Sequence, residues 1–106
     1  MVLAAFAQAD GTLKTRPAVV LREMPPFRDL LICGLSTQLR QQVMGFDELI
    51  SRDDDDYKSS GLVTPSLIRL GFLASVPTDR IMGGIGAIST ERHRRLLEKL
   101  SDYLVR

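Results

Sequence analysis

Two short segments of this chain join an apolar, strand-forming run to groups that can bind phosphate. Residues 14–21 read Lys-Thr-Arg-Pro-Ala-Val-Val-Leu, and Arg16 precedes the apolar run. Residues 32–38 read Ile-Cys-Gly-Leu-Ser-Thr-Gln, and Ser36 and Thr37 follow it. A guanidinium matches phosphate oxygens with parallel N–H donors and keeps its charge, and hydroxyl groups add further donors. If the two runs form neighbouring strands, Arg16 and Ser36 meet at one rim of a sheet.

The composition is that of one small globular domain. The 106 residues are 44% hydrophobic and 25% charged, which disfavours a disordered chain and suffices for one core. No apolar run approaches the roughly 20 residues of a membrane span. Residues 1–7 are apolar, but no basic region precedes them and Asp10 and Gly11 follow, so they predict a strand rather than a signal peptide. We therefore expect a single cytoplasmic domain over residues 1–106, with no membrane partner.

The single cysteine, Cys33, excludes a disulfide framework and a cysteine-based zinc site. Its place in an apolar run favours an inert core thiol over a nucleophile. The charges are unevenly spread, because four of the 13 acidic residues form the run 53–56, which leaves nine acidic against 14 basic residues elsewhere. That balance suits a polyanionic partner. The run itself is either a solvated loop or an acidic rim that repels a polyanion, and it lacks the ligand spacing of a calcium loop.

The hydrophobic pattern predicts mainly short strands. Residues 29–37 show almost no alternation, which predicts a central strand buried on both faces. Pro17 is expected at the first position of its strand, where its missing N–H is tolerated, and Gly71 at a corner between two strands. The expected strands are 2–7, 17–23, 29–37, 65–76 with its corner, and 82–88; residues 46–50 form a strand or one helical turn, and residues 8–15 and 51–61 form loops.

A helix is expected only at the C-terminal end. Ser89 or Thr90 can cap its first turn, which contains Glu91. Many short strands followed by one amphipathic helix predict a mainly β fold, a small, partly open β-barrel closed by a C-terminal α-helix. The apolar stripe of the expected helix consists of Leu96, Leu97, Leu100, Tyr103 and Leu104.

The order and spacing of these motifs resemble the MazF/PemK family of bacterial toxins, whose motifs are an Arg-Pro that opens one strand and a Ser/Thr-x-Gln that closes the next. The resemblance implies an SH3-like barrel with a C-terminal helix over the whole chain. It also implies a homodimer, a cognate antitoxin protein and single-stranded RNA as partners, and no cofactor. The matching segments are Phe6 with Asp10 and Gly11, Arg16 and Pro17, residues 36–38, Gly61 and Leu62, residues 65–70, residues 85–89 and the last helix.

The activity that the resemblance implies is sequence-specific cleavage of mRNA without a metal. In that endoribonuclease reaction the ribose 2′-OH attacks the adjacent phosphate. By the family pattern, Arg16 stabilises the phosphorane and Ser36 supplies a hydroxyl donor, so these two are the expected catalytic residues. The expected substrate-binding residues are Lys14, Thr37, Gln38 and Arg69. For Arg69, which lies between aliphatic residues, an ion pair with a carboxylate of the barrel is an equal alternative.

The chain departs from the family where a general base is expected. Residues 8–15 contain no histidine, and Gly71 stands where some members have an aspartate. Asp10 or a water held by Ser36 are the remaining candidates for the base, and His93 is expected to be exposed on the last helix. A barrel that binds RNA or an antitoxin without cleavage is therefore the alternative function. A gyrase-binding toxin of the same fold is disfavoured, because its Trp-Gly-Ile tail is missing from a chain without tryptophan.

Overall fold

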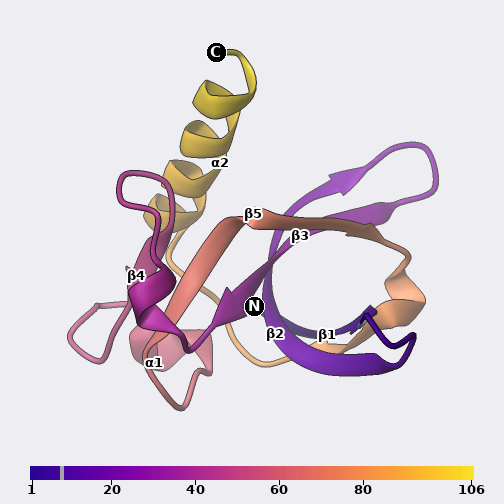
Figure 1. Cartoon of the computed structure of the whole chain (residues 1–106), viewed down its shortest axis with the longest axis horizontal. Helices are drawn as coiled ribbons and strands as arrows, with labels where there is room; N and C mark the ends of the chain where they lie inside the picture. The colour runs from indigo at the N-terminus through magenta and orange to yellow at the C-terminus, as the bar shows by residue number, and fades with distance from the viewer. Residues whose placement is uncertain (8) are drawn as a thin grey trace.

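The computed structural model describes residues 1–7 and 9–106, and in them six strands form one antiparallel sheet (Figure 1). The strand order is β4-β5-β3-β2-β1-β6, so β3 lies in the interior of the sheet as predicted. Two short 3-10 turns and two α-helices complete the fold. The strands are β1 (Val2–Ala7), β2 (Leu13–Met24), β3 (Asp29–Ser36), β4 (Glu48–Ile50), β5 (Ser66–Val76) and β6 (Ile81–Gly84), and the helices are α1 (Tyr57–Ser60) and α2 (Thr90–Leu104).

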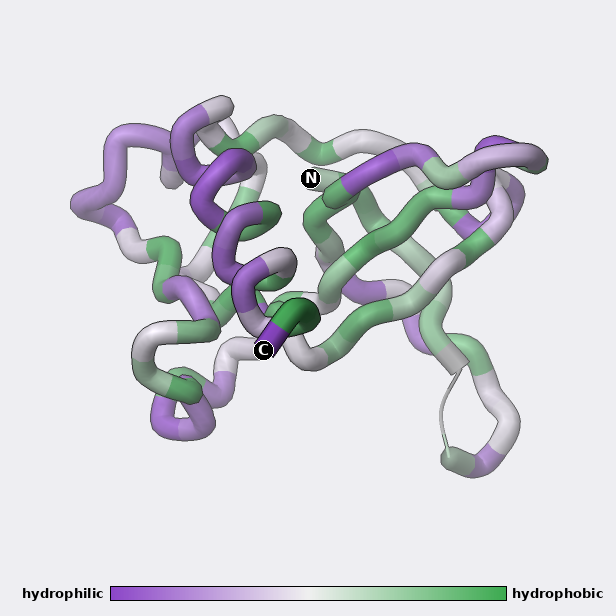
Figure 2. Tube along the Cα trace, turned by 90° about the horizontal axis from the view of Figure 1, so that it is seen from above, coloured by the Kyte–Doolittle hydropathy of each residue, from purple (hydrophilic) through white to green (hydrophobic). Residues whose placement is uncertain are grey.

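The sheet curls into a partly open barrel with one helix against it, which confirms the predicted fold class (Figure 1). Successive residues of β2 serve two cores, because side chains alternate across a strand. Val19 and Leu21 pack in the cluster that α2 covers, whereas Ala18 packs in the cluster inside the curl. Figure 2 shows hydrophobic segments along the strands and hydrophilic segments along α2. Both faces of the central strands are therefore buried.

Strand β2 begins at Leu13, four residues before Pro17, so the predicted first position of Pro17 is wrong. The predicted loop 8–15 is confirmed for residues 9–12 and is wrong for residues 13–15, which belong to β2. Pro17 pairs only with Leu3 of β1, since the ladder between β2 and β3 begins at Ala18. Its missing N–H therefore costs no bond to β3. Pairing with β1, which the local pattern does not encode, extends the strand past the proline. Gln8, in that predicted loop, lies outside the described residues.

The remaining elements follow the predictions with local differences. Residues 46–50 contain the short strand β4, whereas the predicted loop 51–61 contains the one-turn helix α1. Residues 66–76 form one strand, β5, so the predicted division of this segment into two strands at Gly71 is wrong. The register of β5 to β3 instead shifts around Gly71. The last glycine-rich strand ends at Gly84 rather than at residue 88.

Helix α2 begins where the sequence predicts it. The Ser89 hydroxyl accepts a hydrogen bond from the Arg92 amide at 3.0 Å, as an N-cap does. Leu96 and Leu100 are buried, but Tyr103 and Leu104 are exposed, because the end of α2 projects beyond the sheet (Figure 1). The sheet therefore covers only the first part of the predicted stripe. No helix among the described residues is long and apolar enough to span a membrane.

Candidate active site

Arg16 and Ser36 line one small pocket at the rim of the sheet. The pocket has a volume of about 120 Å³ and is formed where β2 begins and β3 ends. Arg16 is half-buried, so part of its side chain reaches solvent. The sequence-predicted residue Thr37 also lines this pocket. The remaining lining residues are Pro17, Leu35 and Ser66.

The pocket exists because β2 and β3 part at this point. Their ladder ends at the pair Ala18 and Gly34. Beyond it, β2 continues beside β1 alone, with Arg16 opposite Ala4, while β3 continues beside β5, with Ser36 opposite Leu67. The two strand ends are thus held by different neighbours, and the space between them is open to a ligand.

The Ser36 hydroxyl is oriented by the turn that follows it. Its Oγ accepts a hydrogen bond from the backbone N–H of Gln38 at 3.0 Å. This bond uses a lone pair, so the hydroxyl proton remains available to donate to a phosphate oxygen. Thr37 and Gln38 are exposed, and Gln38 immediately precedes the 3-10 turn Leu39–Gln41.

Lys14 and Arg69 do not line the pocket. Lys14 is exposed on β2, opposite Phe6 of β1, and lies on the same face as Arg16 because the two are two residues apart. The guanidinium carbon of Arg69 lies 5.8 Å from the centre of the Phe72 ring. Among the described residues no carboxylate lies within ion-pair distance of Arg69, which removes the ion-pair alternative for this residue.

Comparison with known proteins identifies the family. The model of the PemK-like, MazF-like toxin family of type II toxin-antitoxin systems matches residues 1–104. The chain belongs to this family. Its structure is similar to that of the Mycobacterium tuberculosis toxin MazF-mt6, with a TM-score of 0.67 and 20% sequence identity over 98% of this chain and 96% of that chain. At this identity the likeness shows the fold alone. A comparison with curated proteins gives no match.

Neither Asp10, a candidate for the general base, nor the histidine His93 lines the pocket of this MazF-like toxin. The Asp10 carboxylate accepts hydrogen bonds from the Thr12 hydroxyl at 2.7 Å and the Thr12 amide at 3.0 Å. These bonds lower the pKa of Asp10, which makes it a weaker base. His93 is half-buried rather than exposed, and its Nε2 bonds to the carbonyl oxygen of Val20 at 3.0 Å. The prediction of an exposed histidine is wrong because α2 packs this side chain against β2.

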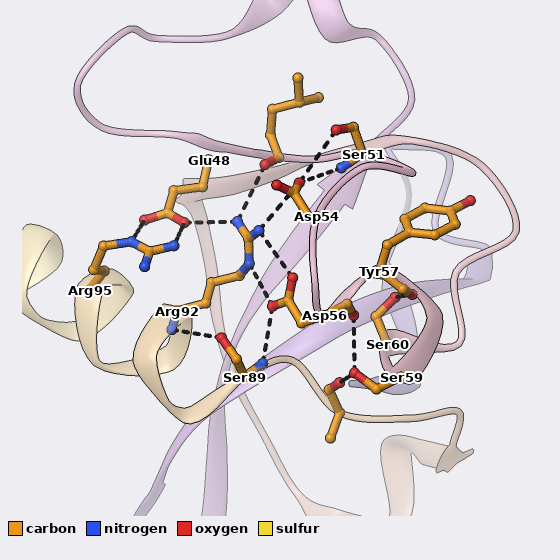
Figure 3. Close-up of polar contacts among 12 residues, drawn as sticks. Glu48, Ser51, Asp54, Asp56, Tyr57, Ser59, Ser60, Ser89, Arg92 and Arg95 are labelled. Atoms are coloured by element: carbon orange, nitrogen blue, oxygen red, sulfur yellow. Dashed lines mark hydrogen bonds and ion pairs between the residues drawn. The ribbon is translucent and has the colours of Figure 1, made fainter.

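Sequence reasoning missed the most connected polar cluster of the toxin, which is centred on the buried Arg92 (Figure 3). Its Nε and Nη2 donate to the two carboxylate oxygens of Asp56 at 2.7 and 3.1 Å. Its Nη1 donates to Glu48 at 2.9 Å and to the Leu49 carbonyl at 3.3 Å. Asp54 lies 3.4 Å away. Arg92 thereby joins α2 to β4 and to the aspartate run.

The cluster extends along α2 and balances its own charge. Arg95 and Lys99 both contact the Glu48 carboxylate, at 3.1 Å each. Burial alone would raise the pKa of Glu48, but the bonds from these two cations outweigh it and lower the pKa. Burial opposes ionisation of Asp56 too, yet the bonds from Arg92 and the Ser89 amide lower its pKa. Both carboxylates therefore stay ionised and act in structure.

The aspartate run is thus not simply a solvated loop, since Asp56 is only 6% exposed. A sequence signal for the cluster existed. Arg92 precedes Leu96 and Leu100 at intervals of four, so it lies on the buried stripe of α2 and needs a partner there.

Within residues 1–7 and 9–106, no group of three or more potential ligands could hold a metal ion. Burial raises the pKa of the Cys33 thiol to about 12, so it is not a thiolate near neutral pH.

Proposed function

We propose that this toxin is a sequence-specific, metal-independent mRNA endoribonuclease that acts through the 2′-OH of its single-stranded substrate. The observation that carries the proposal is the shared pocket of Arg16 and Ser36 at the point where β2 and β3 part. It supplies a cation and a hydroxyl donor at one place, which is what a phosphate with developing negative charge requires. The family membership supports the same reaction class.

In the proposed reaction, the 2′-oxygen forms a bond to phosphorus and the bond from phosphorus to the 5′-oxygen breaks. The products carry a 2′,3′-cyclic phosphate and a 5′-hydroxyl. The guanidinium of Arg16 binds two non-bridging oxygens of the phosphorane, and the Ser36 hydroxyl donates to one of them. The 2′-OH proton passes to a water held at Ser36, and solvent protonates the leaving oxygen. Thr37, Gln38 and Lys14 bind the RNA on either side of the scissile bond.

The alternative function is a barrel that binds RNA or the antitoxin without cleaving. One observation favours it: neither Asp10 nor His93 lines the pocket, and each is bonded to another part of the chain. Under the first proposal, in which the toxin cleaves RNA, catalysis then rests on positioning of the substrate and on electrostatic stabilisation of the transition state, and not on a general base with a tuned pKa. Turnover separates the two functions, since both bind RNA.

The proposal includes a two-fold homodimer in the cytoplasm. Its support is an apolar groove of about 740 Å³ between the end of α2, the turn at residues 43–46 and β5. Met44 at 81%, Leu104 at 67% and Tyr103 at 54% are strongly exposed in one chain. A second copy that covers such side chains would bury on the order of 1,600 Å² in total. Light scattering at micromolar concentration should give the mass of a dimer, and a monomer would refute this part.

The second proposed protein partner is the cognate antitoxin. An acidic and hydrophobic tail that folds on binding would inhibit by occupying the Arg16 pocket. The support is charge complementarity, because Arg16 and Lys14 lie near one another on β2 and a carboxylate can take the place of the RNA phosphate. Protection of RNA by a synthetic acidic tail peptide, lost on replacing its carboxylates by amides, would be the expected result.

The decisive experiment uses a defined RNA and a copy with deoxyribose at the mapped scissile position. The wild-type toxin should cut the RNA, in the presence of a chelator, and leave cyclic phosphate ends. It should not cut the copy that lacks the attacking 2′-OH. A strict requirement for magnesium, or cleavage of the deoxyribose copy, would instead indicate attack by water. Binding without cleavage would favour the alternative function.

A further inference from the structure

Strand β5 bulges opposite a single glycine of β3. Ile68 pairs with Leu35 and Leu73 pairs with Cys33, so residues 69–72 face Gly34 alone. Arg69 and Phe72 stand at the two ends of this bulge. The bend brings them together, since the Arg69 guanidinium carbon lies 5.8 Å from the centre of the Phe72 ring.

The Phe72 ring is fixed in place by its surroundings. A Cβ added to Gly34 would lie 2.6 Å from Cδ2 and 2.9 Å from Cε2 of the ring, so the ring contacts the bare Cα side of the glycine. Phe6 packs against it from within the curl, with the ring centres 5.0 Å apart. The ring therefore occupies a defined site, and that site exists only because position 34 has no side chain.

Arg69 is half-buried and rests on an aromatic ring instead of an acid. A cation within about 6 Å of the centre of an aromatic ring is attracted by the negative face of that ring. A carboxylate partner would neutralise the guanidinium and compete with any anionic ligand, whereas a ring orients it and leaves its charge and N–H donors in place. Since no described carboxylate lies within ion-pair distance, Arg69 is held but not neutralised.

The register places Arg69 beside the pocket. Ser36 pairs with Leu67, and Arg69 follows Leu67 by two residues on the same face of β5. Diagonal neighbours of this kind lie roughly 7–8 Å apart between their Cα atoms, within reach of an arginine side chain. Phe72 contacts Gly34, two residues before Ser36, which places the ring on that face too. Arg16, Ser36 and Arg69 therefore come from three adjacent strands, β2, β3 and β5.

From this geometry we infer that Phe72 is a positioning residue, which holds the guanidinium of Arg69 ready for a second phosphate of the bound RNA. The first phosphate lies in the Arg16 pocket. The identity of the ligand rests on the proposed function, whereas the coupling between Phe72 and Arg69 rests on the bulge and on the ring contacts. Phe72 acts through Arg69 and does not contact the reacting atoms.

The test measures binding of a fully 2′-O-methylated oligoribonucleotide, which has no attacking hydroxyl, by fluorescence anisotropy at several salt concentrations. Loss of one phosphate contact lowers the slope of log affinity against log salt by about 0.7 for a single strand. Arg69→Ala should show this reduction. Phe72→Leu should show most of it although the arginine is present, and Phe72→Tyr should keep the wild-type slope. Arg94→Ala, which removes an exposed arginine from α2, is the control and should change nothing.

The double variant Arg69→Ala/Phe72→Leu separates positioning from a structural role. If Phe72 acts through Arg69, the double variant binds as Arg69→Ala does. Additive losses, or a wild-type slope in either single variant, would overturn the inference. Circular dichroism checks folding, and Phe72→Met, which also lacks the ring, replaces Phe72→Leu if that variant unfolds.

The same preparations separate this inference from the proposed activity. Cleavage of unmodified RNA with an unchanged slope in Arg69→Ala would refute the inference and leave the enzyme standing. If Arg69→Ala and Phe72→Leu both lowered the salt slope but the wild-type toxin never cleaved RNA, the inference would hold and the proposed activity would be refuted. A wild-type protein without salt-dependent RNA binding would refute both.

Discussion

Arg16 on β2 and Ser36 on β3 occupy matching positions, each two residues beyond the last pair of their ladder, Ala18 and Gly34. In a continuous antiparallel ladder they would face one another directly. Here the ladder stops, because β2 follows β1 and β3 follows β5, and both side chains line the gap instead. Because the two strands separate at this point, a pocket that can admit a phosphate forms between the two side chains.

Replacement of Arg16 tests the central assignment. Arg16→Ala should reduce kcat/KM for RNA cleavage ~100-fold or more with the fold intact, because the phosphorane loses its bidentate cation. Arg22→Ala is a matched control, since Arg22 is an exposed arginine on the same strand and does not line the pocket. Single-turnover cleavage and thermal unfolding measure the two effects. Equal activity of the Arg16 and wild-type proteins would exclude Arg16 from the chemistry.

Ser36 should matter through its hydroxyl alone. Ser36→Ala removes the proton donor and the acceptor for the Gln38 amide, so kcat should fall by roughly 100- to 1,000-fold, as for loss of one donor to a developing oxyanion. Ser36→Thr keeps the hydroxyl and should retain most of the activity. If Ser36→Ala raised KM and left kcat unchanged, the hydroxyl would bind the substrate and have no part in the transition state.

The position of Ser36 at the end of an interior strand was predictable from sequence because a local pattern determines that strand. The unalternating run that becomes β3 required burial on both faces, and Ser89 had the chemistry of an N-cap. The N-terminal extension of β2 was not predictable, because pairing with β1 overrides the local preference of Pro17.

The Arg92 cluster shows a second limit of sequence reasoning. Asp56 lies 36 residues before Arg92 along the chain and Glu48 lies 44 residues before it, so nothing in the local pattern links these carboxylates to Arg92. A run of aspartates is ordinarily solvated, and only the fold shows which of them is buried. The bulge that brings Arg69 close to Phe72 is likewise not encoded in the local sequence pattern, because it depends on the register between β3 and β5.

Loss of the Arg92 side chain should destabilise the toxin strongly. Arg92→Met leaves Glu48 and Asp56 buried without this partner, and breaking a buried ion pair in this way costs about 3–5 kcal/mol. Arg94→Met is the control, because its ion pair with Glu98 is exposed and should contribute less than about 1 kcal/mol. Urea unfolding of both variants gives the free energies. A similar small loss in both would show that the cluster does not hold α2 in place.

The same cluster predicts loss of stability in acid. The pKa values of Glu48 and Asp56 in the folded toxin lie below their ordinary values of 4.5 and 3.8. The unfolded chain therefore binds protons first as the pH falls. The stabilising contribution is complete above the ordinary values and is lost as the pH falls through the lower, folded values. Urea unfolding at pH 7, 5, 4 and 3 should show a steep decrease below pH 5, and a smaller one in Arg92→Met. Equal pH slopes in both proteins would contradict this origin.

Substitution of two glycines that share one backbone conformation can distinguish the cost of backbone strain from the cost of a steric clash. Gly61 at φ +80° and Gly45 at φ +79° both lie in the left-handed region, where a side chain costs roughly 1–2 kcal/mol. A Cβ on Gly45 meets nothing within 4 Å, whereas a Cβ on Gly61 would collide with the backbone carbonyl of Ile85.

Both alanine variants should therefore lose stability, and Gly61→Ala should lose about 1–3 kcal/mol more than Gly45→Ala. The difference arises because Gly61, which ends α1, packs on the segment that leads into α2. Ala87 in that segment donates to the Ser59 carbonyl at 2.8 Å, so the clash displaces a fixed contact. Thermal and urea unfolding of the two variants measure the difference directly. Equal losses of stability in the two variants would mean that residues 85–87 can shift at little energetic cost and do not hold α1 against the segment that leads into α2.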